Sequence, residues 1–156
     1  MSLFCPTTNR QINIGLTILR VVVGVIFLAH GGQKIFVFGF PGVTGAFAQM
    51  GVPAAGLLGP FVALVEFFGG LALISGLLTR LASLGLMSTM IVAISLVHLK
   101  AGFFSPAGIE FPLSLLASTL MLAVTGAGAW SLDGLIANRT PKRAADTEPI
   151  RLSRAA

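Results

Sequence analysis

Four polar side chains near the ends of hydrophobic segments are the best candidates for chemistry: His30, Lys34, His98 and Glu110. Two imidazoles and a carboxylate could ligate a metal ion, or hydrogen-bond the carbonyls of a quinone whose tail lies among helices. Their spacing matches no metal-binding motif such as HExxH, so no metal site is assigned. The simpler interpretation is that a membrane interface tolerates polar groups of this kind. These residues therefore form a candidate ligand or quinone rim.

Two charged residues lie inside the hydrophobic segments, where an ionised group is costly unless it has a partner. Arg20 is near the middle of the first segment, and Glu66 is near the middle of the second. Antiparallel packing would bring both to the same depth, so we expect an intramembrane charge pair between them. Such a pair either determines which helices pack together, which is the interpretation we favour, or handles a proton or orients a ligand.

Several classes of function are excluded by what the sequence lacks. The single cysteine, Cys5, provides neither a CxxC redox centre nor a thiol pair for sulfur chemistry. No GxGxxG motif, P-loop, nucleophile elbow or catalytic triad is present, so no catalytic residue is assigned and enzyme activity stays an open question. The net charge of +5 does not indicate nucleic-acid binding, because five of the ten basic residues fall in the last 18 positions without interleaved aromatics.

Membrane helices must position these side chains, because 55% of the residues are hydrophobic and only 10% are charged. Four apolar stretches, each roughly 18 to 22 residues long, are sufficient to cross a hydrocarbon core of about 30 Å. They comprise residues 12–29, 57–78, 81–99 and 112–130. We therefore expect an all-α membrane protein with an antiparallel four-transmembrane-helix bundle. The connection between helices 1 and 2 is expected to be interfacial or re-entrant, with a short helix near residues 43–50.

The distribution of basic residues predicts the orientation of this bundle. Four spans place both termini and the turn at Arg80 on one side, together with Arg10 and five basic residues of the tail, whereas Lys34 and Lys100 lie on the other side. The excess of basic residues indicates that both termini are cytoplasmic. The tail residues in this count are Arg139, Lys142, Arg143, Arg151 and Arg154.

The same reasoning divides the chain into three parts. Residues 1–11 are expected to form a cytoplasmic N-terminus, residues 12–132 the transmembrane domain, and residues 133–156 a flexible basic tail in the cytoplasm. Within the second span, Gly69, Gly70 and neighbouring small residues are expected to allow a close approach of helices.

Several motifs in this order resemble the DoxX family of small bacterial membrane proteins. They are an intramembrane arginine followed by HGxxK in LRVVVGVIFLAHGGQK, a glutamate before Gly-Gly in LVEFFGG, a Leu-Thr-Arg turn, and a final GxGxxSLD in GAGAWSLD. The resemblance covers about residues 18–133 and implies a multi-pass protein of the bacterial inner membrane. It also implies that relatives take part in thiosulfate:quinone oxidoreduction and redox-stress systems. The characteristic positions correspond to Arg20, His30, Lys34, Glu66, Arg80 and Asp133.

These observations lead to three functional expectations. The first is an accessory or quinone-interacting component of a membrane oxidoreductase or redox-stress system, with quinone as the candidate ligand and no covalent cofactor. The second is a non-enzymatic scaffold or chaperone-like subunit that recruits partners. A small-molecule transporter is the least expected function, because the chain has only four predicted spans and no inverted repeat of the kind from which many transporters are built. Redox proteins and a second copy of the chain are the expected partners besides the bilayer.

Overall fold

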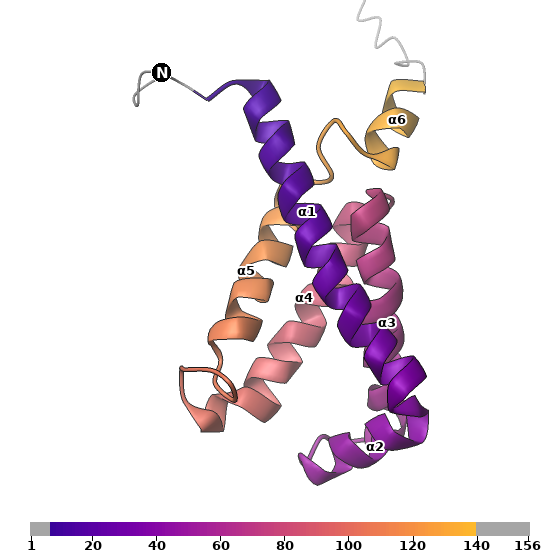
Figure 1. The fold of residues 1–156 in the computed structure, drawn as a ribbon, viewed down its shortest axis with the longest axis vertical. Helices are drawn as coiled ribbons and strands as arrows, with labels where there is room; N and C mark the ends of the chain where they lie inside the picture. Colours follow the sequence, from indigo (N-terminus) through magenta and orange to yellow (C-terminus); the bar gives the residue numbers. More distant parts are fainter. Residues whose placement is uncertain (1–6, 140–156) are drawn as a thin grey trace, which may run out of the picture.

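The computed structural model describes residues 7–139, and these residues are almost entirely helical (Figure 1). Two short π-helical turns, η1 and η2, and one 3-10 turn, η3, continue the longer helices. In chain order the elements are α1 (Asn9–Gly32), η1 (Gln33–Val37), α2 (Gly39–Gln49), α3 (Ala55–Ser75), α4 (Thr79–Ala93), η2 (Ile94–His98), η3 (Leu99–Ala101), α5 (Glu110–Thr125) and α6 (Leu132–Arg139).

The first helix begins at a capping box. The backbone N–H of Gln11 donates to the Thr8 hydroxyl over 3.3 Å, and the Gln11 side chain accepts from the Thr8 N–H over 2.8 Å. From there α1 runs without a break into η1, so the continuous helical segment is Asn9–Val37. This is longer than the expected span at both ends, because apolar length predicts the membrane-buried part of a helix and not its caps.

Within residues 7–139, three helical segments are long and apolar enough to cross a membrane: Asn9–Val37, Ala55–Ser75 and Thr79–Ala101. The fourth apolar helix, α5, has 16 residues and ends at Thr125, earlier than the expected residue 130. It ends there because Gly126 and Gly128 adopt φ values of 79° and 75°, which a continuing helix does not allow. The expected all-α bundle of membrane helices is confirmed.

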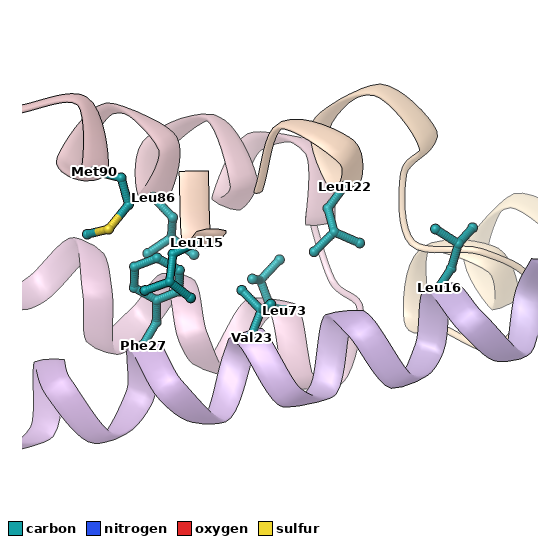
Figure 2. Packing of buried hydrophobic residues seen from close by; sticks show 8 residues of the cluster. All are labelled: Leu16, Val23, Phe27, Leu73, Leu86, Met90, Leu115 and Leu122. Atoms are coloured by element: carbon teal, nitrogen blue, oxygen red, sulfur yellow. The ribbon is translucent and has the colours of Figure 1, made fainter. Parts of the chain in front are cut away.

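The helices pack as two pairs joined at one end. α1 lies mainly along α3, and α4 lies mainly along α5, with α3 and α4 in contact across the turn between them. Figure 1 shows the start of α1 and α6 at one end and α2 at the other, where the two pairs diverge. Buried apolar side chains from α1, α3, α4 and α5 fill the centre (Figure 2): Leu16, Val23, Phe27, Leu73, Leu86, Met90, Leu115 and Leu122.

Glycines allow α3 to approach its neighbours closely, as the sequence predicts. A Cβ atom at Gly70 would lie 2.5 Å from the backbone nitrogen of Leu28 on α1, and one at Gly69 would lie 2.9 Å from Leu86 on α4. On the facing side of α1, a Cβ at Gly31 would lie 2.4 Å from the backbone nitrogen of Phe67. The two helices can therefore meet backbone to backbone only where one of them carries glycine.

The segment between α1 and α3 is helical and folds back along α3. The expected short helix is present as α2, which starts earlier than predicted, at Gly39 with φ 66°. α2 packs against the first turns of α3, where Val43 and Thr44 contact Gly59. This arrangement places most of the backbone polar groups of the segment in helical hydrogen bonds, as a membrane environment requires.

The last described element corrects the predicted start of the tail. Residues 133–139, which the sequence assigns to the flexible tail, belong to α6. This helix is tied to the bundle, because the Asp133 carboxylate accepts hydrogen bonds from the backbone N–H groups of Leu78 and Thr79 over 2.7 and 2.9 Å. The rest of the predicted tail, residues 140–156, lies outside the described residues.

Candidate functional site

The structure does not bring Arg20 and Glu66 together, so the predicted charge pair is wrong. Gly31 of α1 lies against Phe67 of α3, and this register places Arg20 beside Gly76. Gly76 lies ten residues beyond Glu66 on α3, which corresponds to about 15 Å along the helix axis. Arg20 and Glu66 each lie near the middle of a predicted span. They nevertheless lie at different depths, because the two helices are offset along their axes.

Arg20 instead joins α1 to the turn after α3 and to the segment before α6. Its Nη2 donates to the carbonyl oxygen of Trp130 over 2.8 Å, and the residue is 2% exposed. The guanidinium fits against Gly76, where an added Cβ would lie 1.5 Å from Nη1. The nearby Asp133 carboxylate caps the N-terminus of α4. Arg20 thus contacts Trp130 and Gly76 in place of the predicted partner Glu66.

Glu66 forms its ion pair with Lys34. Lys34 Nζ donates to Glu66 Oε2, and the two side chains are 22% and 4% exposed. Lys34 belongs to η1, the π-helical turn that continues α1, and Glu66 lies in the middle of α3. The sequence predicts Lys34 on the rim and Glu66 inside the membrane. The structure combines the two groups because α1 extends far enough for Lys34 to reach back against α3.

A cavity of about 330 Å³ lies beside this ion pair, between the α1–α3 pair and the α4–α5 pair. His30 and His98 line it together with Lys34 and Glu66. We call it the polar cavity. Its other walls are apolar: Ile26, Phe27, Met90, Ala93, Pro106, Phe111, Pro112 and Leu115. Three of the four predicted rim residues therefore meet around one cavity, and Glu66 joins them.

Hydrogen bonds to main-chain carbonyls orient both imidazoles. His30 Nδ1 lies 2.9 Å from the carbonyl oxygen of Ile26, and His98 Nδ1 lies 2.7 Å from that of Ala107. Because a carbonyl oxygen only accepts, each Nδ1 must carry the proton, and in the neutral ring Nε2 is then an acceptor. The His30 ring also packs against Phe111, with ring centroids 6.0 Å apart. Each ring is held so that Nε2 is the nitrogen left for a ligand.

Glu110 does not line the polar cavity. Its Oε1 accepts a hydrogen bond from the backbone N–H of Ser105 over 2.7 Å, which closes the loop before α5. The predicted rim of four residues is therefore corrected to three, with Glu110 holding the loop from which Ala107 reaches His98. Within residues 7–139, no three His, Cys, Asp or Glu side chains are arranged to hold a metal ion.

A second cavity of about 260 Å³ adjoins the first under α2, and we call it the α2 cavity. Lys34, Glu66, Ala93 and His98 line both cavities. The remaining walls of the α2 cavity are Phe47, Met50, Val52, Val62, Thr89, Val92 and Val97. The ion pair and His98 thus form part of the boundary between a polar and an apolar compartment.

Each of the two π-helical turns contributes one residue to the boundary between the polar cavity and the α2 cavity. Lys34 belongs to η1 and His98 ends η2, so the chain departs from regular α-helix at both places. π-Helical turns of this kind occur often at functional sites. The sequence offers no signal for them, since a π turn differs from an α turn by one residue of hydrogen-bond register. Hydropathy does not report that difference.

The fold and the site together define the class of protein: a helical membrane bundle with a polar cavity near one end. The DoxX family model matches residues 15–99. The chain belongs to the DoxX family, and the resemblance found in the sequence is thereby confirmed.

Several relatives are similar over most of their length. "Putative oxidoreductase CatD" of Bacillus subtilis is 35% identical over 128 residues, which cover 82% of this chain and 91% of the relative. "Inner membrane protein YqjF" of Escherichia coli is 33% identical over 125 residues, covering 80% and 93%. The membrane protein Rv3486 of Mycobacterium tuberculosis is 34% identical over 132 residues, covering 78% and 80%. No solved structure matches the chain significantly.

Proposed function

We propose that this DoxX-family membrane protein is a quinone-interacting component of a membrane redox system, and that the polar cavity receives the quinone head group. The observation that carries the proposal is the convergence of His30, Lys34, Glu66 and His98 on one cavity with apolar walls. Its volume lies at the lower end of the range of roughly 300 to 1,000 Å³ typical of small-molecule sites. The name of the B. subtilis relative agrees with a redox role.

The chemistry of a quinone suits these side chains. A quinone is a flat apolar ring with two opposed carbonyl oxygens, which become hydroxyl groups on reduction. Lys34 can donate to a carbonyl oxygen, whereas the Nε2 atoms of His30 and His98 can accept from a hydroxyl group. Phe27 and Phe111 supply the apolar walls against which a ring can lie.

The electrons of such a reaction must come from a partner when the quinone is reduced, or pass to a partner when the quinol is oxidised. The sequence contains one cysteine and no nucleotide-binding motif, so a redox protein bound to this chain would have to reduce or oxidise the quinone. The chain would then act as the membrane subunit that holds the quinone. The scaffold alternative depends on the basic tail, which lies mostly outside the described residues.

A binding experiment tests the proposal. We expect the detergent-purified protein to bind a tailless naphthoquinone in isothermal titration calorimetry. His30→Ala and His98→Ala should each weaken binding of the reduced form, the naphthoquinol, about tenfold, since each removes an acceptor for a quinol hydroxyl group that is worth about 1 to 1.5 kcal/mol. Ser118→Ala is the matched control, because the Ser118 hydroxyl donates within its own helix to Ser114. Absence of binding to the unaltered protein would overturn the proposal.

We further propose that the termini face the cytoplasm of a bacterial cell and that the polar cavity lies in the outer half of the inner membrane. Support comes from Arg10 and Arg80 at the end with the termini, against Lys34 and Lys100 near the other end. Alkaline phosphatase fused after Arg139 should be inactive, whereas the enzyme inserted at Gly51, after α2, should be active. The reverse pattern would contradict this orientation.

A further inference from the structure

We infer that the ligand is a quinone with an isoprenoid tail, and that the tail lies in the α2 cavity while the head group occupies the polar cavity. This inference rests on the proposed function and extends it, because it identifies the ligand as a membrane-resident amphiphile. The starting observation is that the two cavities share Lys34, Glu66, Ala93 and His98. One elongated ligand could therefore occupy both.

The walls of the α2 cavity suit a hydrocarbon chain. Away from the shared boundary, six of its lining residues are apolar: Phe47, Met50, Val52, Val62, Val92 and Val97. The remaining one, Thr89, donates its hydroxyl to the carbonyl oxygen of Leu86 over 2.8 Å, so its proton is already used. A ligand group with its own hydrogen-bonding needs would find partners only at the Lys34 end of this cavity. The α2 cavity is thus polar at one end and apolar elsewhere, which matches the distribution of polarity in an amphiphilic ligand.

The α2 cavity also reaches the outer surface of the helices. Met50 and Val92 line it and are 48% and 37% exposed. In a membrane, this part of the surface is where a chain too long for the cavity can continue into lipid. Phe47 of α2 lines the cavity, with Met50 and Val52 directly after the helix, which gives the folded-back segment a role beyond connecting α1 and α3. A protein partner would not fit an enclosure of about 260 Å³, whereas a single hydrocarbon chain does.

The position of the ion pair explains how head and tail would be separated. Lys34 and Glu66 lie on the boundary, and Glu66 is nearly buried while Lys34 keeps 22% of its side chain exposed. The lysine is the longer and less enclosed of the two, so it is the group that can reach a ligand at the boundary. Because an ammonium group has three donor hydrogens, Lys34 can donate to a quinone carbonyl while it keeps its ion pair with Glu66.

Two ligands and two variants test the inference. A tailless naphthoquinone and the same head group with an isoprenoid tail are titrated into the detergent-purified protein. Val62→Phe fills the α2 cavity and should weaken binding of the tailed ligand about tenfold or more, with binding of the tailless one unchanged within about twofold. Leu64→Phe is the matched control on the same helix, because Leu64 is exposed and lines neither cavity. Val92→Phe fills the cavity from α4 if Val62→Phe does not fold.

A photoreactive group on the tail provides an independent measurement. A tailed quinone carrying a diazirine should label residues 47–52 of the full chain, and an excess of tailless quinone should prevent the labelling by displacing the head group. Labelling elsewhere, or an equal effect of Val62→Phe on both ligands, would overturn the inference and leave the proposed function standing. Labelling prevented by phospholipid but not by tailless quinone would assign the cavity to a lipid chain and also overturn it. If neither quinone binds, the proposed function itself fails.

Discussion

At the scale of the residue, the environment of Glu66 depends on a single neighbour. A carboxylate that is 4% exposed inside a membrane helix requires a cation beside it, and Lys34 provides that cation. Removing one member of a buried ion pair is far more damaging than removing both, because the remaining charge is left without compensation. The pair also faces both cavities, so changes in it should affect folding and binding together.

The ion pair between Lys34 and Glu66 predicts that a second substitution restores the stability lost through the first. Lys34→Met should lower the free energy of unfolding by about 3 kcal/mol, because it leaves Glu66 without its cation. Adding Glu66→Gln to the same chain should recover more than half of that loss, since the amide is neutral and nearly the same shape. Thermal unfolding in detergent measures both effects. Lys100→Met is the control, because Lys100 is exposed at the same end of the molecule. A double variant as unstable as Lys34→Met would contradict this pattern.

At the scale of the element, the contact between α1 and α3 determines where every side chain of α1 lies. This contact is close because glycine occurs where the backbones meet, at Gly31 on one helix and Gly70 on the other. It brings Lys34 to Glu66 and Arg20 to Gly76. Hydropathy predicts both helices but says nothing of their offset, and for this reason the sequence assigned Glu66 the wrong partner.

Alanine substitutions in α1 test this contact. Gly31→Ala should destabilise the protein by about 1 to 3 kcal/mol, because its Cβ would meet the backbone of Phe67, which cannot move without shifting α3. Gly15→Ala, in the same helix, has nothing within 4 Å of its Cβ and should be neutral or stabilising by up to about 1 kcal/mol. Thermal unfolding of the two variants measures the difference. Equal stability would mean that α1 and α3 are not in close contact at Gly31.

At the scale of the whole molecule, an apolar centre separates two polar regions. Arg20 and Asp133 lie beside the start of α6 and the turn between α3 and α4, whereas the polar cavity is lined by residues of η1 and η2. Between them are the buried side chains shown in Figure 2, among them Val23, Leu73 and Leu122. This division suits a protein that holds a ligand on one side of the membrane, and it does not favour the transporter hypothesis.

Substitution of Gly76 tests how strongly the stability of the protein depends on the packing around Arg20. Gly76→Ala should cost more than about 3 kcal/mol, because a Cβ would overlap the buried Arg20 guanidinium and would also strain the backbone at φ 70°. Gly51→Ala is the control for strain alone, since Gly51 has φ 76° with nothing within 4 Å of its Cβ, and it should cost roughly 1 kcal/mol. Folded yield and thermal unfolding distinguish the two. Similar losses in both would show that the contact with Arg20 contributes little.

The sequence by itself determined the class of the protein, because apolar length and scarce charge leave few alternatives to membrane helices. It also placed His30, Lys34, His98 and Glu110 at one membrane interface, since they lie near the ends of antiparallel spans. Only the tertiary structure decided that Glu66 lines the polar cavity and that Arg20 and Glu110 do not. The physical reason is that pairing depends on the offset and rotation of packed helices, which backbone contacts at glycine and the π-helical turn at Lys34 establish in three dimensions.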